Sequence, residues 1–346
     1  MRNHGMRRAA AVAAGGALTL FTALLCVSLG SVRIPLDETW RIIGGALLGR
    51  PGPEGPFTAI LLSVRLPRVL CAGLMGAALS LCGAAMQGLL RNPLADGSTL
   101  GVSAGASLGA AGAILLGFSL PGFALGGTAL LAMAFAFLSL LLILGLSYAL
   151  DRSLSTQTIL LTGVIFSMLV SSALSLLIAF SGEKLRSITF WTMGSLSGMG
   201  YAQALLLLGV LAPFGGLLLF LGRELNAFAL GEENARQVGV PVRRVKLLVM
   251  IAASALIGAC VSVGGCIGFV GLIVPHMTRF VTGPDHRRLL PASLFAGGIF
   301  LMLTDLCART LLRPLELPLG AVTSVMGAAV FLIIFYRERR KERGAC

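Results

Sequence analysis

The sequence predicts an all-α polytopic membrane protein with about ten transmembrane helices. Its 346 residues are 56% hydrophobic and only 12% charged, whereas a soluble domain carries about 25% charged residues. A helix needs about 20 apolar residues to cross a bilayer. Apolar runs of roughly that length cover 9–29, 67–90, 98–117, 122–149, 154–180, 202–222, 245–265, 269–282, 289–308 and 317–336, of which 269–282 is too short to cross alone. We expect one transmembrane domain over 1–346.

The first run follows the basic segment MRNHGMRR, as a secretory signal would. Its apolar part is longer than the roughly 7–15 residues of a signal core, and no clear cleavage site follows it. We therefore expect a retained transmembrane helix.

The connection 31–57 contains the amphipathic piece LDETWRIIGGALL. Asp37 is a candidate N-cap for a short helix there. Trp40 suits a membrane interface, so this helix is expected to lie along the outer surface.

The segment Arg65 to Gly109 is rich in glycine and alanine. Gly101, Gly105 and Gly109 recur at four-residue intervals, which places them on one helix face. Small residues at that spacing let membrane helices approach closely. This pattern predicts a tightly packed bundle rather than a simple lipid anchor.

Most of the 27 lysines and arginines fall on one side if ten runs cross the membrane and the N-terminus is cytoplasmic. The positive-inside rule then places both termini in the cytoplasm. The basic tail RERRKER is accordingly interpreted as a topology anchor and not as a nucleic-acid arm.

A faint repeat relates Gly76, Ser80 and Pro93 to Gly258, Ser262 and Pro275, 182 residues later. In the ten-helix topology these copies run in opposite directions. Inverted repeats of this kind occur in many transporters.

The residues needed for chemistry within this chain are missing. None of the lysines follows a glycine, so the sequence has no GxxxxGK[ST] phosphate loop. Three scattered histidines, and seven cysteines without CxxC spacing, predict neither a catalytic site nor a metal site. Asp305 and Arg309, four residues apart on one helix face, are expected to pair with each other. Energy for transport is therefore expected from another subunit.

The polar loop 225–246 is the expected attachment point for that subunit. Glu232 to Gln237 favour a short helix, which Gly239 and Pro241 would end. Physics alone leaves two interpretations open, an ordinary solvated connector and a helix that transmits rigid-body motion.

Several long motifs resemble the iron-siderophore, haem and vitamin B12 (FecCD-type) permease family of ABC importers, in family order across nearly the whole chain. They are RLPR (65–68), GAALSLCGAAMQGLLRNPLAD (76–96), LGVSAGASLGA (100–110), WTMGSLSG (191–198), LGEENARQVGV (230–240), IGFVGLIVPHMTRFVTGPDHRRLLP (267–291) and ELPLGAVTSVMGA (316–328).

The resemblance implies a fold like the vitamin B12 importer permease, with ten helices per subunit, in a homodimer or a pair with a homologous permease. It further implies two ATPase subunits that hold the ATP, an extracytoplasmic substrate-binding protein and a bacterial cytoplasmic membrane. This chain would bind no cofactor and no metal of its own and would not be an enzyme.

Individual positions also match the family. The coupling segment, which docks on the ATPase, corresponds to Gly231, Glu232, Glu233, Ala235, Arg236 and Gly239. Arginines that meet glutamates of the binding protein correspond to Arg65, Arg68 and Arg309. Gate positions correspond to Leu94, Ser155 and Thr156.

Substrate identity rests on the family alone. A ferric siderophore is expected because it is the most widespread substrate class there, with haem and cobalamin as the other two. A stand-alone secondary transporter with inverted repeats is the alternative function, although the sequence offers little for the mid-membrane ion site that it needs.

Overall fold

The computed structural model describes residues 2–30, 34–48, 55–96, 100–120 and 126–343, and every regular element in these ranges is helical. The helices are α1 (Arg2–Ser28), α2 (Leu36–Leu47), α3 (Pro56–Ala59), α4 (Leu66–Leu90), α5 (Val102–Leu116), α6 (Gly126–Leu150), α7 (Thr156–Ala179), α8 (Leu185–Thr192), α9 (Tyr201–Val210), α10 (Gly216–Phe220), α11 (Gly222–Phe228), α12 (Glu232–Gln237), α13 (Val242–Gly264), α14 (Val270–Thr282), α15 (His286–Ala308) and α16 (Leu319–Arg343). Short π-helical turns, Ile60–Arg65 and Leu211–Gly215, continue α3 into α4 and α9 into α10.

All ten expected apolar runs coincide with helices, and the all-α prediction is confirmed. The runs correspond to α1, α4, α5, α6, α7, α9 with α10, α13, α14, α15 and α16. Within the described ranges, seven helical stretches are long and apolar enough to cross a membrane. The beginnings of the runs 98–117 and 122–149 lie outside the described residues, as do 31–33 and 49–54 of the outer connection.

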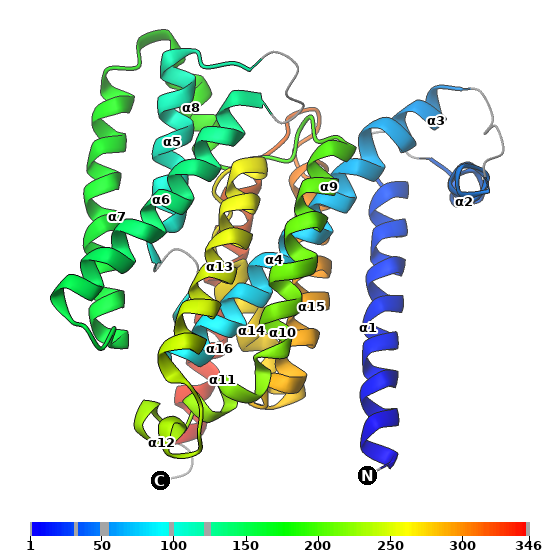
Figure 1. Ribbon diagram of the computed structural model, residues 1–346. Helices are drawn as coiled ribbons and strands as arrows, with labels where there is room; N and C mark the ends of the chain where they lie inside the picture. Colours follow the sequence, from blue (N-terminus) through cyan, green and yellow to red (C-terminus); the bar gives the residue numbers. More distant parts are fainter. Residues whose placement is uncertain (1, 31–33, 49–54, 97–99, 121–125, 344–346) are drawn as a thin grey trace.

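Helix α4 forms the centre of the bundle and is buried along most of its length. It crosses the molecule obliquely and packs against α9, α10, α13, α14 and α15 (Figure 1). Helices α5 to α8 form a second group on one flank. Helix α1 stands on the opposite flank, against α15.

Glycines make the central contacts close enough for backbone to meet backbone. A Cβ atom on Gly76 would lie 2.2 Å from the carbonyl oxygen of Gly297 in α15. One on Gly83 would lie 1.8 Å from that of Gly271 in α14. Because real Cβ atoms do not approach so closely, only glycine allows α4 to pack here.

The glycine face predicted in α5 is confirmed for two of its three members. Gly105 and Gly109 pack against Ser139 and Leu131 of α6, where a Cβ atom would clash. Gly101 instead precedes the helix, with φ of +71°, and serves as its N-cap residue. The four-residue spacing could not distinguish a helical glycine from one in the turn just before it.

The amphipathic helix of the outer connection is present as α2, but the N-cap prediction is wrong. Pro35 occupies the N-cap position, without a side-chain cap, and Asp37 lies inside the first turn, where its charge still suits the helix dipole. Helix α2 runs across the direction of α1 (Figure 1), and the Trp40 side chain is exposed.

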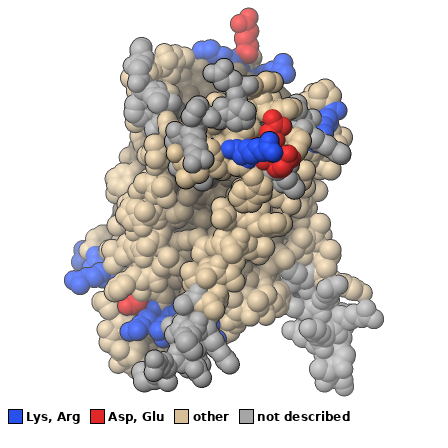
Figure 2. Space-filling model, turned by 90° about the vertical axis from the view of Figure 1, so that its right-hand side faces the viewer, with Lys and Arg blue, Asp and Glu red and all other residues tan. Residues whose placement is uncertain are grey.

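Charged residues gather at the two ends of the molecule and leave an uncharged band between them on the face that Figure 2 shows. We call the end of the bundle that contains α12 (Glu232–Gln237) the α12 end, and the opposite end, which contains α3 (Pro56–Ala59), the α3 end (Figure 1). The start of α1 and the end of α16 both lie at the α12 end (Figure 1).

Candidate functional sites at the two ends of the bundle

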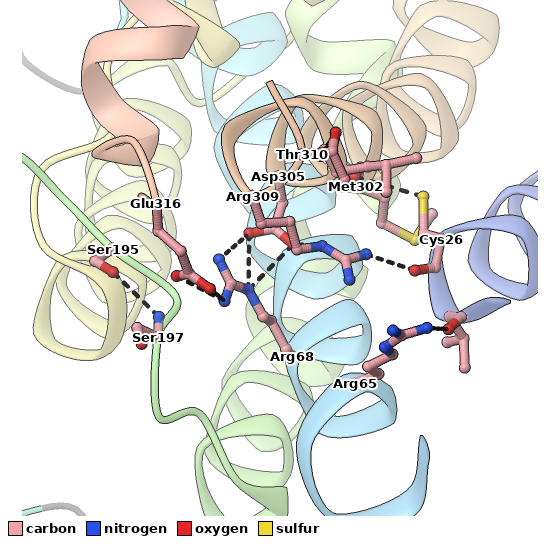
Figure 3. Close-up of polar contacts among 12 residues, drawn as sticks. Cys26, Arg65, Arg68, Ser195, Ser197, Met302, Asp305, Arg309, Thr310 and Glu316 are labelled. Carbon is pink, nitrogen blue, oxygen red and sulfur yellow. Dashed lines mark hydrogen bonds and ion pairs between the residues drawn. The ribbon is translucent and has the colours of Figure 1, made fainter. Parts of the chain in front are cut away.

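A cluster of five charged residues lies at the α3 end, and we call it the arginine cluster (Figure 3). Its members are Arg65, Arg68, Asp305, Arg309 and Glu316. The π-helical turn before α4 carries Arg65, and the first turn of α4 carries Arg68. Asp305 and Arg309 lie at the end of α15, and Glu316 lies in the segment before α16. The cluster therefore joins the beginning of α4 to α15, the helix that packs most closely against α4.

Asp305 is the central acceptor of this cluster. Its carboxylate lies 3.0 Å from the Arg68 Nε atom and 3.2 Å from the Arg309 Nε atom, so the expected pairing of Asp305 with Arg309 is confirmed. Arg68 also donates from Nη1 to both oxygens of Glu316 at 3.0 Å.

The three arginines lie together at the α3 end (Figure 3), but their side chains are not free at the surface. Arg65, Arg68 and Arg309 are only 4%, 8% and 8% exposed. Arg65 donates to the carbonyl oxygens of Val27 and Ser28 at the end of α1, at 3.0 Å. Arg309 donates to the carbonyl oxygen of Cys26, also in α1. These bonds attach α1 to the bundle, and the sequence alone could not predict them.

Glu316 is the part of the cluster that reaches solvent, since its side chain is 46% exposed, whereas that of Asp305 is 1% exposed. Because Arg68 pairs with both carboxylates, the exposed Glu316 is the member of the cluster at which an outside partner can reach Arg68.

The coupling segment at the α12 end has the predicted form. Helix α12 is bracketed by Gly231, with φ of +105°, and Gly239, with φ of +87°, conformations that favour glycine. Ala235 is completely buried under the helix, while Glu233 and Arg236 are exposed.

Beside α12 lies an open groove of about 960 Å³. Arg236, Arg243 and Arg244 supply its charge, and the rest of its lining comes from residues 239–241 and from apolar side chains at the start of α13. A short exposed helix beside a basic, partly apolar groove is a suitable surface for another protein to bind.

Glu232 is not simply exposed to a partner, because it is bonded within the chain. One carboxylate oxygen accepts from the Lys246 Nζ atom at 2.6 Å, and the other accepts from the Thr156 hydroxyl at 2.6 Å. Burial opposes ionisation of this carboxyl, but the bonds from Lys246 and Thr156 outweigh it and lower the pKa of Glu232.

The three predicted gate residues belong to two elements, the start of α7 and the turn after α4. Ser155 is the N-cap of α7, and Thr156 begins that helix beside Glu232. Leu94 lies in the turn after α4 and is half exposed, with its N–H bonded to the Asn92 side chain at 2.9 Å. That turn also approaches α12, because the Arg91 guanidinium lies over Gly231.

Sequence reasoning missed two functional candidates, Lys246 and Glu316. The charge pattern marks Lys246 only as one more cytoplasmic cation, and its position near the start of an apolar run is the one sequence signal that singles it out. Among the described residues, no group of three or more His, Cys, Asp or Glu side chains could hold a metal ion.

Residues 18–337 match the FecCD transport family. The chain is 43% identical to the uncharacterized ABC transporter permease protein YvrB of Bacillus subtilis, over 97% of this chain and 96% of that protein. It is 40% identical to the hemin transport system permease protein HmuU of Yersinia pestis, over 82% and 85% of the two chains. It is 41% identical to the vitamin B12 import system permease protein BtuC of Citrobacter koseri, over 80% and 83%.

A solved structure with a similar fold is described as an inward-facing conformation of a metal-chelate type ABC transporter. The TM-score is 0.83 at 31% sequence identity, covering 94% of this chain and 98% of that one.

Proposed function

The chain belongs to the FecCD transport family, and from this premise we propose that it forms the path by which a ferric siderophore enters a bacterial cell. It is an all-helical, multi-pass membrane protein and the permease subunit of an ABC importer for metal chelates, and it is not itself an enzyme. Membership in this family argues against the alternative of a stand-alone secondary transporter.

The proposed assembly contains two copies of this chain, or one copy and a homologous permease. Two ATPase subunits bind the α12 end and hold the ATP, and a substrate-binding protein binds the α3 end. The α12 end and both termini then lie in the cytoplasm, in agreement with the positive-inside rule. Transport proceeds by alternating access, in which ATP closes the ATPases and the motion reaches the gates.

The coupling role of Gly231 to Gly239 is supported most strongly by the form of α12. It is a short, exposed helix between two glycines, anchored by the buried Ala235. We expect deletion of Ala235 to leave ATP hydrolysis intact while substrate uptake stops. Glu232→Arg should also stop uptake, with an added loss of stability because Glu232 neutralises the buried Lys246. Unchanged uptake in both variants would contradict the coupling role.

The docking role of Arg65, Arg68 and Arg309 is supported by their gathering at one end of the bundle, where Arg68 is bonded to the half-exposed Glu316 (Figure 3). Because these side chains are buried and bonded, reversing their charges would disturb folding as well as docking. Glu316→Gln is a cleaner test, since it removes the exposed carboxylate that competes for Arg68. We expect tighter docking of the binding protein, with a gain that shrinks as salt is raised.

A ferric siderophore is the proposed substrate because that class is the most widespread in the family. A tetrapyrrole chelate is the second candidate, since two relatives are named for hemin and vitamin B12. Fluorescence titration of the cognate binding protein with a ferric hydroxamate, haemin and cyanocobalamin distinguishes them. Tight binding of haemin or cyanocobalamin alone would overturn the siderophore assignment.

The first experiment is affinity purification of the tagged chain from its native membrane in mild detergent, with mass spectrometry of the proteins that accompany it. Recovery of an ATPase in equimolar amount supports the proposed assembly. Recovery of the chain alone, even after gentle crosslinking, would contradict it.

A further inference from the structure

A lysine is buried near the start of α13. Lys246 is 2% exposed, and its Nζ atom donates to the Glu232 carboxylate at 2.6 Å and to the Leu154 carbonyl oxygen at 2.9 Å. A buried ammonium group is tolerated only when its charge is paired and its protons are bonded. Lys246 therefore holds α12 and the turn before α7 against the start of α13.

Glu232 extends this connection to α7 itself. Its second oxygen accepts from the Thr156 hydroxyl at 2.6 Å, in the first turn of α7. One carboxylate thus joins three elements that lie apart in the sequence, namely α12, α13 and α7. Hydrogen bonds to a charged group are stronger than neutral ones, so this junction is stiff.

The turn before α7 is held in an unfavourable backbone conformation. Leu154 has φ of +53°, which is uncommon for a residue with a side chain, and it is buried. Its N–H donates to the Asp151 carbonyl oxygen at 2.9 Å, and the N–H of Ser155 donates to the Asp151 carboxylate at 3.0 Å. A conformation of this kind persists only where its surroundings determine it, and such positions cluster at switching regions.

We propose that Lys246, Glu232 and Thr156 form a rigid link that carries motion of α12 directly to the beginning of α7. This inference rests on the proposed function, in which α12 binds the ATPase and α7 begins at a gate. Lys246 is a positioning residue that fixes the Glu232 carboxylate, and the Thr156 hydroxyl is the point where the motion enters α7.

A purely structural interpretation is that the pair of Lys246 with Glu232 only neutralises a buried charge. That pair needs no bond to Thr156, so the Thr156 hydroxyl separates the two interpretations. Thr156→Val removes this bond without changing the size of the side chain and leaves the ion pair in place. Thr156→Ser restores the hydroxyl. Thr19→Val is a matched control, because the Thr19 hydroxyl bonds only to Gly15 within α1.

The test is hydrogen exchange of the permease in complex with its ATPase, with and without ATP and vanadate, read separately over α12 and over the start of α7. In the wild-type chain, in Thr156→Ser and in Thr19→Val, ATP should change exchange in both segments. In Thr156→Val, the change should persist in α12 and be lost from the amides of Thr158 and Ile159. An undiminished response there would overturn the link.

Hydrogen exchange of the same variants in the absence of the ATPase tests the link independently of the proposed function. In the purified chain alone, Thr156→Val should speed exchange of the Thr158 and Ile159 amides about tenfold, the effect of losing one hydrogen bond to a charged group. Unchanged exchange overturns the link even if an ATPase binds. Faster exchange in a chain that binds no ATPase supports the link and overturns only the proposed function.

Discussion

Removing either carboxylate of the arginine cluster should destabilise the protein, but to very different extents. Asp305→Asn and Glu316→Gln each replace a carboxylate by an amide of the same shape. In the folded protein, Asp305 lies between two arginines and is 1% exposed, whereas Glu316 contacts Arg68 alone and is 46% exposed. Both variants lower the negative charge of the cluster by one, so a difference between them comes from burial and from the number of arginines that each carboxylate pairs with.

The expected magnitudes follow from that difference. Asp305→Asn leaves the buried Arg309 guanidinium without a charged partner, and breaking a buried ion pair from one side costs about 3–5 kcal/mol. Glu316→Gln removes an ion pair that water already screens, and Arg68 keeps Asp305. Pairs of that kind contribute about 0–1 kcal/mol.

The assay is thermal unfolding of the purified protein in one detergent, followed by the loss of soluble, correctly sized protein on gel filtration. Asp305→Asn should lower the midpoint strongly at both low and high salt. Glu316→Gln should lower it slightly, and only at low salt. Equal shifts in the two variants, or a stable Asp305→Asn protein, would refute the assignment of Asp305 as the central acceptor.

Three further predictions concern packing and the α12 end. Gly76→Ala should destabilise the bundle, because the new Cβ atom would lie 2.2 Å from the Gly297 carbonyl oxygen. Gly73→Ala in the same helix is the control, since its Cβ atom would meet only the Met302 side chain at 3.5 Å. In the same melting assay, Gly73→Ala should unfold like the wild-type protein. The lowered pKa of Glu232, set by the bonds from Lys246 and Thr156, means that its carboxylate stabilises the fold above the usual glutamate range and loses this effect only as pH falls through the lowered pKa. Protection of the α7 amides, corrected for the intrinsic pH dependence of exchange, should therefore persist as pH falls to the ordinary glutamate pKa of 4.5, and loss of protection there would contradict the lowered pKa. Enlarging the completely buried Ala235 to leucine should displace α12 and weaken ATPase binding in a pull-down, and undiminished binding would contradict its anchoring role.

The helices could be predicted from sequence because each depends on neighbouring residues. Apolar length placed the ten runs, and Gly231, Gly239 and Pro241 marked the ends of α12 correctly. Boundaries failed where a local signal had two meanings. Asp37 fits both an N-cap and a first turn, and Gly101 fits both a helix face and the turn before it.

The candidate sites were less predictable because their contacts join distant parts of the chain. Arg68 and Asp305 are 237 residues apart, and Thr156 and Glu232 are 76 apart. A motif can assign Arg68 to a docking face, but its burial depends on where α15 brings Asp305. Composition likewise counts Lys246 as one more cytoplasmic charge, although its environment is the interior of the α12 end.

These contacts also change how the two ends of the importer are expected to work. If the arginines were free at the surface, docking would only have to steer two charged faces together. Because they are already bonded to Asp305, Glu316 and the end of α1, an acidic partner docking as we propose would have to exchange with an internal carboxylate, and Glu316 is the accessible one. Docking at the α3 end would then loosen a contact between α4 and the segment before α16. A substrate-binding protein that docked with equal affinity to wild-type and Glu316→Gln permease would show that no such exchange occurs.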